Sequence, residues 1–115
     1  MSFEAKARMN GALAVLDLHG DVDGQADADL NAAYDGVIAS DARRVLLNFA
    51  DVSYINSTGI ALIVGLLAEA RRSGRSILAC GLSDHYKEIF EITRISDFIE
   101  IVDDEGAALQ AGTPT

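Results

Sequence analysis

The segment from Asp51 to Ile60 holds the residues whose types and spacing are best suited to chemistry. Ser57 and Thr58 place two hydroxyl groups where an apolar, strand-like stretch gives way to a helical pattern. The first N–H groups of a helix have no partner inside the helix, and a Ser, Thr or Asn side chain can accept hydrogen bonds from them. A purely structural interpretation is therefore that Asn56, Ser57 or Thr58 caps the helix.

The same position also suits a phosphate group. An exposed hydroxyl at a helix N-terminus can carry a phosphate without unfolding the chain, because the free N–H groups and the helix dipole favour an anion there. Phosphorylation would add a charge of about −1.5 to −2. Gly59 leaves the approach to the hydroxyls uncrowded, and it also allows the helix start to pack closely on a neighbour. The two interpretations of Gly59 are compatible.

Other reactive side chains form no recognisable catalytic or metal-binding motif. His19 and His85 have no second His, Cys or carboxylate at a spacing typical of such motifs. The sequence contains no glycine-rich phosphate loop of the Walker or dinucleotide type. Cys80 is the only cysteine, and a core position suits it better than the role of a nucleophile. We therefore expect no catalysis, no cofactor and no metal.

The elements that must position Ser57 begin with a hairpin. Residues 3–9 alternate in polarity, Asn10-Gly11 readily takes the positive φ angles of a two-residue turn, and Leu13–Leu18 follows as a second strand. Gly20–Gly24 then breaks the strand pattern. Apolar residues at helical spacing predict a first helix that runs to about Ser40.

The second half of the chain alternates strands and helices. Strands are expected at Val45–Phe49, Ser76–Cys80 and Phe98–Val102, helices at Ser57–Arg72, Ser83–Arg94 and 103–110, and a loop at 50–56. In the helix from Ser57, we expect Ile63, Val64 and Leu67 in the core and Ile60 partly exposed. A hairpin followed by such alternation predicts an α/β fold, with a mixed, mainly parallel sheet of about five strands and about four helices.

Composition is typical of one compact domain. The chain has 115 residues, of which 50% are hydrophobic, and a net charge of −9. Such a charge repels a nucleic-acid backbone or an anionic membrane surface, and the longest apolar run, Ile60–Ala68, is far below the roughly 20 residues that span a bilayer. With one cysteine and no secretory pattern at the N-terminus, a cytoplasmic location is expected. We expect a single domain over residues 1–110 and a disordered tail over 111–115.

In its sequence motifs the chain resembles the STAS domains, whose stand-alone bacterial members act as anti-sigma factor antagonists. The resemblance covers nearly the whole chain. Its most specific part is Ile55–Ile60, similar to the family's pattern of apolar residue, Asp, Ser, Ser or Thr, Gly and apolar residue. Gly20–Asp23 looks like the family's segment before the first helix, and Ile89-Phe90 with Ile95 resembles its third-helix pattern.

The resemblance implies a STAS-like fold and a phosphorylation-controlled mechanism. The unphosphorylated protein would bind an anti-sigma factor, often itself a serine kinase, and free the sigma factor; phosphorylation of the first Ser would end that binding, and a phosphatase is the implied further partner. By position, Ser57 is the implied acceptor and Thr58 the second choice. The implied partner-binding residues are Asp21, Asp23, Asn56, Ser57, Thr58, Gly59 and Ile60. For Asp23, capping of the first helix is an equally good explanation.

The sequence departs from the family pattern at two positions. Asn56 stands where well-known antagonists have Asp; it keeps the shape and the capping ability but lacks the charge on which a partner or kinase could rely. Arg94 stands where many relatives have Gly. STAS domains also occur as scaffolds of stress-sensing assemblies and as subunits of lipid-transport ATPases. A lipid-transport subunit needs no phosphorylatable Ser, and Asn56 is compatible with that role. Nucleotide binding is a weaker alternative, which the negative charge disfavours.

Overall fold

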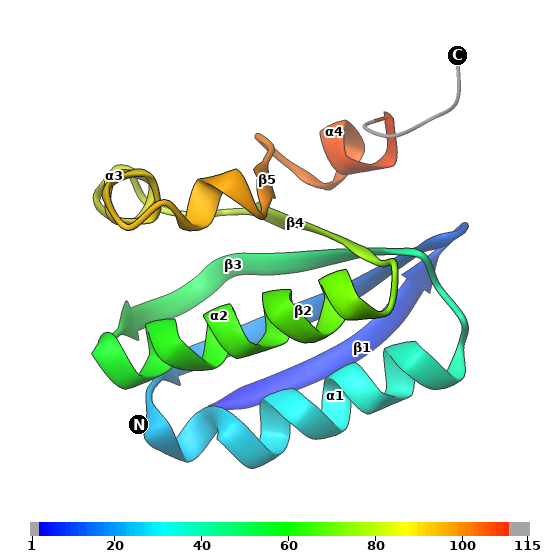
Figure 1. Cartoon of the computed structure of the whole chain (residues 1–115), viewed down its shortest axis with the longest axis horizontal. Coiled ribbons are helices and arrows are strands. Elements are labelled where there is room, and N and C mark those ends of the chain that lie inside the picture. Colours follow the sequence, from blue (N-terminus) through cyan, green and yellow to red (C-terminus); the bar gives the residue numbers. More distant parts are fainter. Residues whose placement is uncertain (1–2, 111–115) are drawn as a thin grey trace.

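The computed structural model describes residues 3–110 and shows one mixed sheet with helices on both faces (Figure 1). Its five strands lie in the order β1-β2-β3-β4-β5; β1 and β2 are antiparallel and the other neighbouring pairs are parallel. This confirms the predicted fold class. The tail predicted over 111–115 lies outside the described residues. The elements are β1 Glu4–Asn10, β2 Leu13–Val22, the 3-10 turn η1 Gly24–Ala26, α1 Asp27–Ala39, β3 Arg44–Ile55, α2 Ser57–Arg72, β4 Ser76–Cys80, α3 Asp84–Ile92, the 3-10 turn η2 Ile95–Asp97, β5 Glu100–Ile101 and α4 Glu105–Gln110.

The opening hairpin forms as predicted, but its turn is displaced by one residue. Asn10 is the last residue of β1 and pairs with Leu13, so the loop is Gly11-Ala12 rather than Asn10-Gly11. Gly11 alone in this loop has a positive φ, +61°. A glycine with positive φ at the first loop position is the pattern of a type II′ turn, whose twist matches that of the two strands.

Two strands are longer than the sequence predicts. β2 continues through Gly20 to Val22, and β3 continues through the expected loop to Ile55. The reason is long-range parallel pairing, which runs as far as Asp21 with Tyr54 and Val22 with Ile55. The register shifts between Gly20 and Asp21, and Gly20 takes a φ of +92° there, which glycine accommodates without steric cost. As a result the ends of β2 and β3 lie side by side directly before α2.

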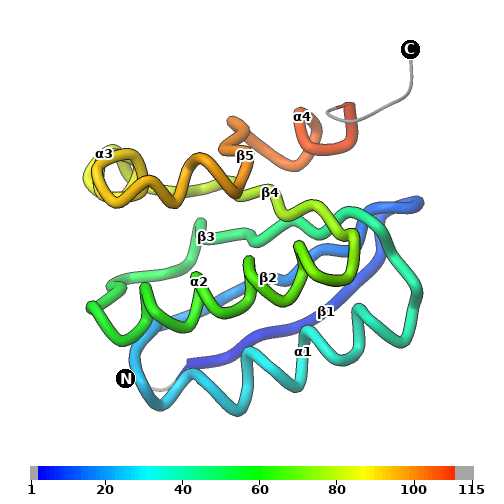
Figure 2. Tube along the Cα trace, viewed as in Figure 1, coloured from blue at the N-terminus to red at the C-terminus, as the bar shows by residue number. Residues whose placement is uncertain are grey.

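The core is divided between the two faces of the sheet. α1, α2 and α3 pack on one face, where Leu30, Ile63 and Phe90 join the inward side chains of the strands, while α4 covers part of the other face through Ala108 (Figures 1 and 2). Cys80 is buried, as predicted. The prediction for Val64 is wrong: its side chain is 45% exposed, and Leu66 is buried in the core instead.

A polar network fixes α4 to the sheet. The Arg8 guanidinium donates hydrogen bonds to Asp17 of β2 and to Glu105 of α4, and Asn10 also donates to Glu105. These bonds favour the charged carboxylates, so the Arg8 guanidinium holds the pKa of both Asp17 and Glu105 below the usual range. The Arg44 guanidinium donates to the carbonyl of Ala108, which satisfies a helix end that would otherwise lack a partner.

Candidate functional site

Asn56 is the residue that caps α2. Its backbone is extended, and its side-chain oxygen accepts a hydrogen bond from the N–H of Gly59 at 2.8 Å. Ser57 and Thr58 are both exposed, and neither hydroxyl has a hydrogen-bond partner among residues 3–110. Of the three capping candidates, Asn56 thus performs the structural task, and both hydroxyls remain available at the N-terminus of the helix.

Gly59 joins the start of α2 to the end of β2. The residue is buried, and a Cβ atom built on it would lie 1.9 Å from the carbonyl oxygen of Val22. The backbone N–H of Asn56 donates to that same oxygen at 3.2 Å. Only glycine allows the two backbones to come this close, so the close packing predicted for Gly59 is observed. Its contribution to the site is to hold the two hydroxyls in place.

The segment after β2, formed by Asp23 and η1, lies beside the start of α2. Asp23 accepts a hydrogen bond from the N–H of Gln25 at 2.9 Å and thereby caps η1, so its capping role, predicted for the first helix, is realised on the 3-10 turn before α1. A Cβ built on Gly24 would lie 3.4 Å from the methyl carbon of Thr58. Contact between η1 and the start of α2 brings the predicted residues of the two segments into one region.

Two tyrosines that were not predicted from the sequence also belong to this region. Tyr54, which pairs in register with Asp21, is 53% exposed at the end of β3. Tyr86 of α3 accepts a hydrogen bond on its hydroxyl oxygen from the N–H of Ile55 at 2.9 Å and so fixes the last residue of β3. An aromatic residue beside the apolar Ile55 was the available signal for Tyr54, but it is informative only once β3 is known to reach that far.

We call the surface formed by Asp21, Asp23, Tyr54, Asn56, Ser57, Thr58 and Ile60 the α2 edge. Asp21, Asp23, Asn56 and Ile60 are half-buried in it, and Ile60 also packs against the core. The two chain segments that form the edge, 20–27 and 51–60, contain no Lys or Arg. The edge therefore combines two free hydroxyls, an exposed aromatic ring and acidic side chains, which suits contact with a protein.

Groups suited to catalysis or metal binding do not gather at the α2 edge. His19 Nδ1 lies 3.4 Å from a carboxylate oxygen of Asp51 on the neighbouring strand, and both side chains are largely exposed. His85 of α3 stacks edge-on against the ring of Tyr86. Within residues 3–110, no three His, Cys, Asp or Glu side chains come together as metal ligands would. No helix in this part of the chain has the length and apolar character needed to cross a membrane.

A family model and a curated relative each match most of the chain. The family model described as "Mlab, STAS domain" matches residues 5–103. An anti-sigma-B factor antagonist of Listeria monocytogenes is 29% identical over 106 residues, which cover 92% of each chain.

Solved structures of two further proteins share the fold. An anti-sigma factor antagonist of Mycobacterium paratuberculosis aligns with a TM-score of 0.76 at 16% identity, over 96% of this chain and 93% of its own. The antagonist SpoIIAA of Bacillus aligns in its unphosphorylated form with a TM-score of 0.72 at 20% identity, over 92% and 94%. Its phosphorylated form gives 0.70 at 19%, over 92% and 97%.

Proposed function

The chain belongs to the STAS domain family, and on that premise we propose that it is an anti-sigma factor antagonist whose α2 edge binds an anti-sigma factor while Ser57 is unphosphorylated. The partner acts as the serine kinase that modifies Ser57, and a phosphatase returns the protein to its binding form. In this account the protein is a regulatory binding protein and not an enzyme.

One observation carries the proposal: the helix cap and the phosphate acceptor are different residues. Asn56 satisfies the N–H of Gly59, so the Ser57 hydroxyl is exposed at the start of α2 without a structural duty. A phosphate on Ser57 would meet the positive end of the helix dipole. The folded protein therefore tolerates the modification.

Phosphorylation of Ser57 is expected to weaken binding of the partner. The segments that form the α2 edge contain no Lys or Arg that could pair with the phosphate, and Asp21 and Asp23 add negative charge beside it. A dianion at the contact surface must then be desolvated by the partner, which is costly unless the partner supplies a matching cation. Phosphorylation thus works as an off switch for binding.

The relatives support this function. The Listeria monocytogenes protein is named an anti-sigma-B factor antagonist, and SpoIIAA is described as an anti-sigma factor antagonist with an unphosphorylated and a phosphorylated form. The acceptor motif Ile55–Ile60 is retained here apart from Asn56. Ser57 is the better candidate acceptor of the two hydroxyl residues, because it occupies the acceptor position of the motif. The methyl group of Thr58, by contrast, lies against η1.

Two alternatives are a stress-signalling scaffold and a STAS subunit of a lipid-transport ATPase, with which Asn56 is compatible. Such a subunit needs no modified serine, and a neutral cap suffices for it. Affinity purification of the tagged protein from its native cell, followed by mass spectrometry, separates the possibilities. Recovery of a kinase-like anti-sigma factor supports the proposed function, and recovery of a transporter ATPase overturns it.

Ser57→Ala should stay folded and remain able to bind the anti-sigma factor permanently. Because Asn56 keeps the cap, we expect the free energy of unfolding to change by less than about 0.5 kcal/mol, measured by urea titration. Asn56→Ala is the matched control and should lose about 1 kcal/mol. Collapse of Ser57→Ala would show that Ser57 is structural first.

Ile60 and Leu67 should separate binding from stability. Leu67 is only 6% exposed, so Leu67→Ala should lower the free energy of unfolding by about 2–4 kcal/mol. Ile60 is half-buried at the α2 edge, and Ile60→Ala should mainly weaken binding of the anti-sigma factor. Thermal unfolding and calorimetric titration measure the two effects. Equal loss of stability with unchanged affinity would remove Ile60 from the binding surface.

A further inference from the structure

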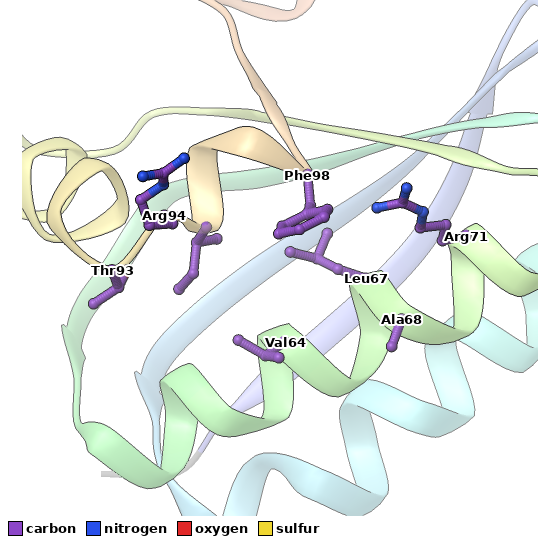
Figure 3. A pocket seen from close by; sticks show the side chains of 8 residues that line it. Val64, Leu67, Ala68, Arg71, Thr93, Arg94 and Phe98 are labelled. Atoms are coloured by element: carbon purple, nitrogen blue, oxygen red, sulfur yellow. The ribbon is translucent and has the colours of Figure 1, made fainter.

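An apolar groove lies between α2 and the turn that follows α3, beyond the α2 edge (Figure 3). Its volume is about 290 Å³, and Val64, Leu67, Ile95 and Phe98 form its floor and walls. Val64 and Phe98 are 45% and 55% exposed. Large apolar side chains that remain exposed together around a hollow are typical of a surface that binds another molecule.

The groove carries an arginine at each end, as Figure 3 shows. Arg71 lies over the ring of Phe98 at 5.2 Å, and its guanidinium forms no ion pair with any described residue. Arg94 is 80% exposed and pairs with Asp97 at 2.9 Å. Asp97 offsets one of the two positive charges, so the rim of the groove stays positive in a chain whose net charge is −9.

Arg94 also has an unfavourable backbone conformation. Its φ is +67°, in the left-handed region, and the residue follows Thr93, the C-cap of α3. Glycine takes this conformation readily, whereas an arginine is strained there. Strained backbone conformations of this kind are often found at functional sites. The side chain of Arg94 lies at the rim of the groove.

We propose that this groove binds an acidic amphipathic helix of a protein partner. Apolar residues on one face of that helix would contact Val64 and Phe98, and carboxylates beside them would pair with Arg71 and Arg94. An apolar groove beside a helix is a common binding site for the apolar face of an amphipathic helix. Guanidinium groups form strong hydrogen bonds with carboxylates. A second copy of the chain fits poorly, because a symmetric contact would oppose the arginines of both copies and add two net charges of −9. The groove does not include Ser57, so this inference goes beyond the proposed switch.

The test uses two synthetic, fluorescently labelled peptides and the full chain. Both peptides carry Leu at positions i, i+3, i+4 and i+7 of a helix; one has Glu at the flanking positions and the other has Lys. Fluorescence anisotropy gives the affinity, and amide NMR locates the contact. We expect the Glu peptide to bind with shifts confined to the groove, and the Lys peptide to bind at least about tenfold more weakly.

Variants of the two arginines make the test specific. Arg71→Ala should weaken binding of the Glu peptide about twofold to fivefold, whereas Arg72→Ala, the adjacent arginine of α2 that pairs with Glu69, should leave it unchanged. Arg94→Gly should raise the melting temperature while it weakens binding, a combination that loss of folding cannot produce. Val64→Asp should weaken binding more than either arginine variant. Ser57→Asp should bind the peptide as the unmodified chain does, which keeps this result separate from that of the switch.

Four outcomes would overturn the proposal. The first two are no binding of the Glu peptide at about 1 mM and equal binding of both peptides. The third is a set of NMR shifts in the groove that depend on the protein concentration alone, because these would indicate binding of a second copy. The fourth is sedimentation of the protein with phosphatidylglycerol vesicles that Val64→Asp abolishes, because this would indicate a lipid surface as the occupant.

Discussion

Gly59→Ala should lower the free energy of unfolding by about 3 kcal/mol, which corresponds to a fall in melting temperature of about 10 °C or more for a domain of this size. The added Cβ would lie 1.9 Å from the carbonyl oxygen of Val22 and 2.6 Å from its carbonyl carbon. Both are backbone atoms at the end of a paired strand, so neither can move aside as a flexible side chain could. The start of α2 must shift, and the hydrogen bond from Asn56 to Val22 weakens with it.

Gly65→Ala is the matched control for this prediction. Gly65 lies in the same helix, is exposed, and has nothing within 4 Å of its added Cβ. Alanine is the better helix former, so this variant should gain about 0.5–1 kcal/mol. Thermal unfolding of both variants by circular dichroism measures the difference. A Gly59→Ala protein that melts with the unmodified chain would show that the α2 edge is not held by close backbone contact.

Phosphorylation of Ser57 should lower the affinity for the anti-sigma factor by about 100-fold or more. A dianion left unpaired in an interface commonly costs several kcal/mol, and each 1.4 kcal/mol is about tenfold in affinity. Asp21 and Asp23 increase the negative charge at the α2 edge, and the segments that form it contain no Lys or Arg. The modified chain therefore relies on the backbone N–H groups of the first turn of α2, which stabilise its own fold but not the complex.

Ser57→Asp should reproduce this effect only in part, because a carboxylate has less charge and a different shape from a phosphate. We expect a loss of about tenfold, measured by isothermal titration calorimetry. Ser73→Asp adds the same charge at the opposite end of α2 and should leave the affinity unchanged. Equal affinity of Ser57→Asp and the unmodified chain would argue against a charge-based switch.

Local patterns predicted those parts of the fold that local interactions determine. The bounds of α2, Ser57–Arg72, follow from its apolar spacing, its cap and the arginines of its last turn. β4 at Ser76–Cys80 was predicted for a similar reason, because its apolar run is continuous. In both cases the sequence near the element contains the information that defines it.

The parts that were predicted wrongly depend on contacts between distant segments. β3 reaches Ile55 only because Asp51–Ile55 pairs with the end of β2, and the polar residues there read as a loop on their own. Val64 has the right spacing for the core, but only the position of η2 shows that the residue lines an open groove. Tyr54 could not be placed at the site until the end of β3 was known. By contrast, the start of α2 at Ser57 and its capping by one of the residues 56–58 were predicted from the sequence, because the cap and the helix are adjacent in the chain.

Asn56 shows how the substitution of an expected Asp can leave the geometry intact. Its side-chain oxygen accepts the hydrogen bond from Gly59 as a carboxylate would. The missing charge makes the α2 edge less negative, and we expect this to affect recognition by the proposed partner more than it affects folding.

The most direct test of the central claim is to phosphorylate the protein with the serine kinase that we propose as its partner and to compare the two forms. Mass spectrometry maps the modified residue, amide NMR spectra locate the structural change, and calorimetry gives the affinity. We predict one phosphate at Ser57, chemical-shift changes confined to the α2 edge and its immediate neighbours, and loss of binding. Modification at another residue, shifts spread across the whole sheet, or undiminished affinity would each contradict the account.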